Sequence, residues 1–128
     1  EEDCHERETA THPSTIYGLA KLSAANYLEA LGRVGLSTAW ARLFFLYGPG
    51  ASEQRMPGVV ISSLRIGQPA LCSDGQQWRD FLHIEDASEA LVRLVDSDVT
   101  GTVNVCSGEP VMIRQMASTV AELMGHPD

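Results

Sequence analysis

The sequence predicts an α/β fold, with a parallel sheet and flanking helices. Apolar residues on both faces mark residues 37–47 as a central strand, because parallel sheets are covered on both sides. Helix signals and strand signals alternate along the chain, and this alternation favours the α/β class. Gly48-Pro49-Gly50 ends the central strand abruptly. Open α/β sheets place their ligands beyond the carboxyl ends of their strands, so this loop is a candidate binding loop.

A long helix should precede the central strand. Residues 1–12 are an irregular, polar lead-in, and Pro13 is followed by two hydroxyl residues that suit a helix start. The helix should run over about residues 15–31, where apolar residues recur with helical spacing. Gly32 is suited to its end.

Helices and short strands should alternate after the Gly-Pro-Gly loop. A helix is expected over about residues 56–66 because Pro57 suits a first turn, although Val59-Val60-Ile61 would also suit a strand. Two short strands should form a hairpin around an Asp74-Gly75 turn. A further helix should begin at Glu85-Asp86, where carboxylates meet the positive end of the helix dipole. The expected bounds are 70–72 and 78–84 for the hairpin strands, 102–106 for a late buried strand and 112–124 for a last helix.

Composition narrows the possible functions. The 128 residues suit one domain, and the net charge of −8 without a Lys/Arg cluster argues against binding nucleic acid or an anionic membrane. No apolar run reaches the roughly 20 residues that span a bilayer, and the acidic first residues do not resemble a signal peptide. Cys4, Cys72 and Cys106 have no metal-like spacing, which indicates reduced thiols, no metal site and a cytoplasmic setting.

Tyr17 and Lys21 are the first candidate pair for chemistry. Lys21 is the only lysine of the chain, and it follows Tyr17 by four residues. Residues four apart share one face of a helix, and an ammonium beside a phenol favours the phenolate. The pair therefore has the composition and spacing of a proton-transfer site, and an exposed tyrosine followed by an exposed lysine is the alternative.

Four stretches of the chain carry motifs in a fixed order. They are Pro13–Lys21 with Y-x-x-x-K, Arg42–Gly50 with its G-P-G end, Trp78–Asp86 with R-D-F-x-H-x-x-D, and the late strand Gly101–Gly108. In this order and spacing they resemble the extended short-chain dehydrogenase/reductase family, in its NAD-dependent epimerase/dehydratase branch that acts on nucleotide sugars.

The resemblance implies part of a Rossmann-like parallel sheet plus a small substrate-domain portion with a helix and a short hairpin. Residues 1–128 would form a single partial domain. Within it, residues 13–50 would belong to the cofactor-binding part and residues 51–128 mostly to the substrate-binding part, with one returning strand. The family's G-x-x-G-x-x-G turn and its upstream catalytic Ser/Thr have no match in this sequence. Family members are more than twice as long, so the resemblance implies a central-to-C-terminal segment.

The resemblance also implies a catalytic pair and a cofactor, NAD or NADP. In the family the tyrosine exchanges a proton with the sugar, and the lysine contacts the nicotinamide ribose. These roles fall on Tyr17 and Lys21, which both catalyse and bind the cofactor. Phe44 and Tyr47 are expected to line the nicotinamide, and a place in the core is the alternative for Phe44.

Four further residues are expected to bind a nucleotide-sugar substrate. Arg79 matches a position that contacts the substrate diphosphate, and an ion pair with a neighbouring acid is its alternative. Arg55 and Met56 match the loop and helix start that line the pocket. Phe45 stands where sugar epimerases commonly have Asn, so this side chain cannot make that hydrogen bond, and a dehydratase or reductase stays open.

Two functions from different classes follow for the chain. The first is part of an NAD(P)-dependent nucleotide-sugar epimerase, dehydratase or reductase. The second is a catalytically silent fragment or partner subunit, because the Gly-rich turn has no match in these residues. Self-association through the Tyr17–Lys21 helix is expected in either case, since Ala24 and Ala25 permit the close approach of a second helix. An unrelated α/β binding module is the third interpretation.

Overall fold

The computed structural model describes residues 4–126, which form two compact units. The first unit holds the chain up to Leu43 together with Ser88–Val105. The second unit holds Phe44–Ala87 and the chain from Cys106 onward. The chain thus enters each unit twice, and each unit is described below by itself.

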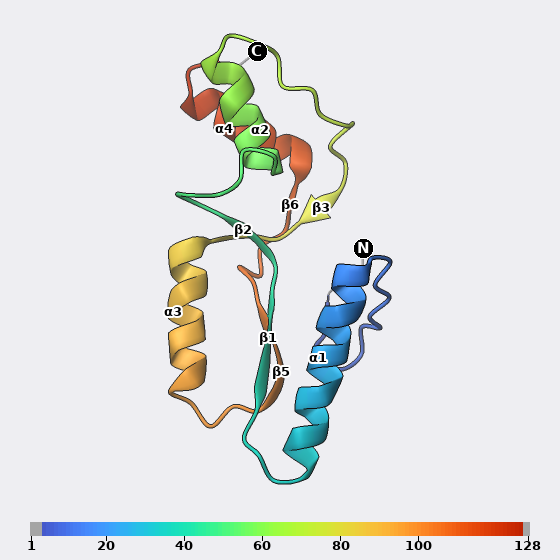
Figure 1. Ribbon diagram of the computed structural model, residues 1–128. Helices are drawn as coiled ribbons and strands as arrows, with labels where there is room; N and C mark the ends of the chain where they lie inside the picture. Colours follow the sequence, from blue (N-terminus) through green and yellow to red (C-terminus); the bar gives the residue numbers. More distant parts are fainter. Residues whose placement is uncertain (1–3, 127–128) are drawn as a thin grey trace. The chain divides into compact units, whose positions relative to one another are not determined.

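A parallel strand pair and a long helix make up most of the first unit. β1 (Ala39–Leu43) pairs in parallel with β5 (Gly101–Val105), with Ala39 opposite Gly101 and Leu43 opposite Val105. Helix α1 (Ile16–Arg33) packs against β1, and α1 and α3 (Ile84–Val95, its last eight residues in this unit) flank the strand pair in Figure 1. The expected α/β class with parallel strands is confirmed.

The start of α1 is determined by residues that the sequence already singled out. The Thr15 hydroxyl accepts a hydrogen bond from the Gly18 amide at 3.0 Å, so Thr15 is the N-cap. A Cβ on Gly18 would lie 2.8 Å from the Pro13 Cβ. Only glycine therefore fits at position 18 as long as Pro13 keeps its place before the helix. The helix bounds are within two residues of those expected.

The expected central strand over residues 37–47 is interrupted at Phe44. The chain leaves β1 at Leu43 and continues as β2 (Phe45–Tyr47), which pairs in parallel with β4 (Phe81–His83) in the second unit. The Phe45 amide donates to the Asp80 carbonyl at 3.1 Å, so the change of strand partner is complete within one residue. The expectation of one continuous strand was therefore wrong.

Two packed helices form the other end of the second unit. α2 (Met56–Arg65) and α4 (Ile113–Leu123) lie against each other in Figure 1. The Val59-Val60-Ile61 run lies within α2 and is therefore helical, as expected, rather than a strand. Val60 is only 2% exposed. Leu82 of β4 is a buried apolar strand residue of this unit.

The expected hairpin around Asp74-Gly75 is wrong. Residues 70–72 are not a strand, and β3 (Trp78–Arg79) pairs antiparallel with β6 (Val111–Met112) instead. Gly75 does have φ +66°, but its carbonyl accepts from the Arg114 amide at 3.0 Å. A Cβ at Gly75 would lie 2.8 Å from the same Arg114 nitrogen. This glycine therefore permits a long-range backbone contact and not a two-residue hairpin turn.

Among residues 4–126, no helix is long and apolar enough to cross a membrane.

Candidate functional site

The expected catalytic pair lies on the exposed face of α1 in the first unit. The Lys21 ammonium nitrogen lies 5.6 Å from the centroid of the Tyr17 ring, so the two side chains share one helix face. Tyr17 is 73% exposed, and its hydroxyl is therefore accessible to a partner molecule. The geometry leaves the pair available for proton transfer, and its catalytic role stays a prediction.

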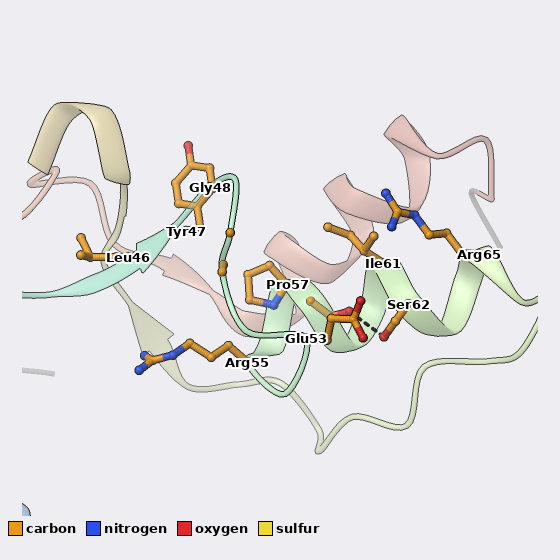
Figure 2. A pocket seen from close by; sticks show the side chains of 12 residues that line it. Leu46, Tyr47, Gly48, Glu53, Arg55, Pro57, Ile61, Ser62 and Arg65 are labelled. Atoms are coloured by element: carbon orange, nitrogen blue, oxygen red, sulfur yellow. Dashed lines mark hydrogen bonds between the residues drawn. The ribbon is translucent and has the colours of Figure 1, made fainter. Parts of the chain in front are cut away.

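A hollow of about 310 Å³ lies beside the Gly48-Pro49-Gly50 loop in the second unit (Figure 2). Tyr47 and Arg55, both expected site residues, line it together with Glu53 and Arg65. Arg55 and Arg65 extend at opposite ends of the hollow in Figure 2, and Glu53 lies between them. The hollow therefore offers positively and negatively charged side chains to a polar ligand.

Two glycines give this hollow its shape. Gly48 has φ +140°, and a Cβ there would lie 2.7 Å from Ile84 Cγ2. Gly58 lets the loop approach α2, because a Cβ there would lie 2.7 Å from the Glu53 Cα. The Tyr47 ring stands edge-on to His83 with the ring centroids 5.3 Å apart. These contacts fix the end of β2 against the start of α3.

A second hollow, of about 370 Å³, is lined by Met56 and Arg79. Arg79 lies over the Phe45 ring, with 5.4 Å between Cζ and the ring centroid, and Nη1 donates to the Trp78 carbonyl at 2.6 Å. The alternative for Arg79 was an ion pair with Asp80 or Glu85, and the ion pairs recorded among the described residues include neither. The other lining residues are Gln54, Val59, Leu71, Cys72, Ser73, Gln77 and Ile113.

Asp80 is a residue whose role the sequence did not indicate. It is 8% exposed, and its two carboxylate oxygens accept the amides of Ser107 and Gly108 at 2.7 and 2.8 Å. It thereby joins the β3–β4 junction to the turn that follows β5. The signal was present in the R-D-F stretch, but sequence alone does not give the amides that face a carboxylate.

The pKa of Glu6 departs clearly from its ordinary value. The Asn104 backbone amide donates to the Glu6 carboxylate at 3.1 Å, and this bond is the main cause that lowers the pKa of Glu6 from 4.5. The charges of His5 and Arg42 lower it further. Glu6 and Arg42 also line a hollow of about 610 Å³ in the first unit. The hydrogen bond from the Asn104 amide to the Glu6 carboxylate thus attaches the segment around Glu6 to β5.

The expected site residues fall into two groups. Tyr17 and Lys21 belong to the first unit, whereas the six expected binding residues from Phe44 to Arg79 belong to the second. Within the second unit the structure brings Phe45 and Arg79 into contact, Met56 and Arg79 around one hollow, and Tyr47 and Arg55 around the other. Phe44, half-buried at the strand break, lines neither of these two hollows.

Parallel strands flanked by helices define an α/β protein. The model of the NAD dependent epimerase/dehydratase family matches residues 1–106, and the chain belongs to this family. The resemblance inferred from the four motif stretches is confirmed.

Curated relatives and solved structures agree with this assignment. The chain is 28% identical to dTDP-4-dehydro-6-deoxy-D-allose reductase of Streptomyces bikiniensis, over 99% of this chain and 41% of that protein. It is 29% identical to dTDP-L-rhamnose 4-epimerase of Burkholderia thailandensis, over 94% of this chain and 35% of that protein. The fold matches dTDP-glucose 4,6-dehydratase from Bacillus anthracis in complex with NAD, with a TM-score of 0.88 and 21% identity, over 98% of this chain and 41% of that one. The chain therefore spans less than half the length of these relatives.

Proposed function

We propose that the protein is an NAD(P)-dependent epimerase, dehydratase or reductase of nucleotide sugars, with Tyr17 as its general acid–base. The observation that carries this proposal is the Tyr17–Lys21 pair on one exposed helix face in a chain of this family. The relatives named above act, by their names, on dTDP-linked sugars. Their reductase and epimerase activities differ, so the reaction type of this chain is left at the three classes.

The pair supplies the chain's part of the proposed reaction. The Tyr17 hydroxyl would give its proton to the oxygen of a sugar keto group, and in the reverse direction the Tyr17 phenolate would take a proton from a sugar hydroxyl, at the carbon where a hydride is exchanged. The Lys21 ammonium nitrogen lies 5.6 Å from the centroid of the Tyr17 ring, on the same face of the helix. NAD or NADP supplies or accepts the hydride when bound. The exposed Tyr17 hydroxyl and Lys21 ammonium fit contact with such a cofactor, since both are hydrogen-bonding groups that could bond to a ribose hydroxyl.

The second unit supplies the proposed substrate contacts. Arg79 and Arg55 are the cations, and guanidinium groups bind phosphate oxygens through two parallel hydrogen bonds. Met56 provides apolar surface in the hollow that Arg79 lines. Tyr47, which lines the other hollow with Arg55, is proposed to contact the nicotinamide of the cofactor. Self-association through α1 belongs to the same proposal, because Ile16 and other apolar residues of this helix are exposed, and sedimentation velocity tests it.

The test uses protein expressed from its full reading frame, NAD or NADP, and a panel of UDP-, dTDP- and GDP-sugars. Tyr17→Phe keeps the ring and removes the hydroxyl, so kcat should fall by about 10²–10⁴. Tyr27→Phe is the matched control, since Tyr27 is an exposed tyrosine of the same helix.

Full activity in Tyr17→Phe would contradict the assigned role. A protein that binds neither NAD nor NADP and turns over none of the sugars would favour the catalytically silent alternative. Calorimetry of cofactor binding and the activity panel together separate these outcomes.

A further inference from the structure

The Arg79 side chain, at the end of β3, lies over one ring of an aromatic pair that Phe45 of β2 forms with Phe81 of β4. The parallel register of β2 and β4 sets Phe45 opposite Phe81, with ring centroids 5.9 Å apart and planes inclined at 54°. The Phe45 ring is 46% exposed, and the Arg79 guanidinium lies over it at 5.4 Å. Arg79 ends β3, two residues before Phe81, so the contact follows from the strand order and not from a flexible loop.

The surroundings of Arg79 leave its charge uncompensated by its nearest acid. The Asp80 carboxylate, the neighbouring negative charge in sequence, accepts the amides of Ser107 and Gly108, one at each oxygen. The Trp78 carbonyl accepts one of the five guanidinium N–H groups and fixes the near edge of the group. The Arg79 guanidinium therefore lies beside a hollow of about 370 Å³ without an ion pair to Asp80.

A ring beneath a guanidinium differs from an acid beside it. The five N–H donors lie in the guanidinium plane, so an aromatic face attracts the cation without occupying any of them. A carboxylate or amide oxygen at the Phe45 position would instead accept one or two of these N–H groups. Phe45 thus holds the cation in place and leaves its outer donors for a ligand.

We propose that Phe45 is a positioning residue that holds the Arg79 guanidinium ready to fork onto the diphosphate of the substrate. This inference rests on the proposed function, because it takes the ligand to be a nucleoside diphosphate group. Stacking reduces the rotamer freedom that Arg79 would otherwise lose on binding, so the benefit is expressed as affinity.

The experiment measures UDP, dTDP and GDP binding by calorimetry in protein expressed from its full reading frame. Phe45→Leu keeps an apolar side chain without a ring face, and affinity for the preferred nucleotide should fall about two- to fivefold. Phe45→Tyr restores the ring and should bind as the unchanged protein does. In an Arg79→Gln background, Phe45→Leu should cause no further loss, because the two residues act as one unit.

Phe81→Leu is the matched control. It removes the neighbouring ring of the same pair but leaves the one beneath Arg79, so nucleotide affinity should change less than in Phe45→Leu. The Arg79 Nε–H resonance should shift in Phe45→Leu through loss of the ring current, with most other amide resonances unchanged. That spectrum verifies an intact fold without any ligand.

Equal nucleotide affinity in Phe45→Leu and the unchanged protein would overturn this inference alone, provided that nucleotide sugars are turned over. An equal loss on Phe45→Leu with and without Arg79 would overturn it as well, because the effect would not pass through Arg79. A protein that binds none of the nucleoside diphosphates would overturn both the inference and the proposed function.

Discussion

Replacing Asp80 by Asn tests the most specific buried polar contact in the structure. Both carboxylate oxygens accept backbone amides, from Ser107 at 2.7 Å and Gly108 at 2.8 Å. Asparagine keeps one acceptor oxygen and turns an NH₂ group toward the other amide. A hydrogen bond to a charged group contributes about 1.5–3 kcal/mol, and an unsatisfied amide costs about 1–3 kcal/mol. Because Ser107 and Gly108 are exposed and water can reach them, the lower part of the sum applies: about 2–3 kcal/mol.

Denaturant unfolding measures this loss, and amide hydrogen exchange locates it. Exchange at Ser107 and Gly108 should accelerate in Asp80→Asn by more than at other amides of the second unit. Asp86→Asn is the matched control, because Asp86 is exposed in the first turn of α3 and should lose only about 0.3–1 kcal/mol of helix-dipole stabilisation. If Asp80→Asn were no less stable than Asp86→Asn, the conclusion that Asp80 joins the β3–β4 junction to the turn after β5 would be wrong.

Two further perturbations test the loop and the lead-in segment. Gly48→Ala should destabilise the protein by at least about 2 kcal/mol, because its φ is positive and the new Cβ would meet Ile84 at 2.7 Å, whereas Gly50→Ala has the strain of a positive φ without a clash and should cost about 1–2 kcal/mol. Thermal unfolding compares the two, and equal losses would refute the contact argument. Glu6→Gln should reduce stability near neutral pH. Because the pKa of Glu6 is lowered in the folded state, the charged form stabilises the fold above its ordinary value of 4.5, and this contribution is lost as pH falls through the lowered pKa. The stability difference between Glu6→Gln and the unchanged protein should therefore shrink as pH is lowered below 4.5, and a difference independent of pH would contradict the charge argument.

Helix positions could be predicted well because their determinants are local. Thr15 caps α1 through a hydroxyl that lies three residues from its donor, and Pro57 stands in the first turn of α2. The apolar run around Val60 was ambiguous by composition, and the flanking proline decided it in favour of a helix. Each of these signals acts within one helical turn, where sequence spacing and spatial neighbourhood coincide.

Strand partners could not be predicted because they depend on residues far apart in the chain. The Asp74-Gly75 dipeptide is a strong turn signal, yet the Gly75 carbonyl accepts an amide from Arg114. Trp78 pairs with Met112 rather than with the segment just before the turn. Nothing in the local pattern distinguishes these outcomes, since both satisfy the same backbone groups.

The candidate site repeats this division between local and distant information. The Tyr17–Lys21 pair is visible in sequence because four residues on a helix bring two side chains to one face. The Phe45–Arg79 contact is not visible, because it needs the strand break at Phe44. A continuous strand over residues 37–47 would place Phe45 on the face of Leu43 by the alternation of side chains. Once the chain changes partner at Phe44, the orientation of Phe45 follows instead from its register with Phe81. Phe45, which stands where the resemblance expects Asn, is thus placed under a cation by a strand break that the sequence did not predict. This placement makes Phe45 a candidate for a role in binding and not merely a lost hydrogen bond.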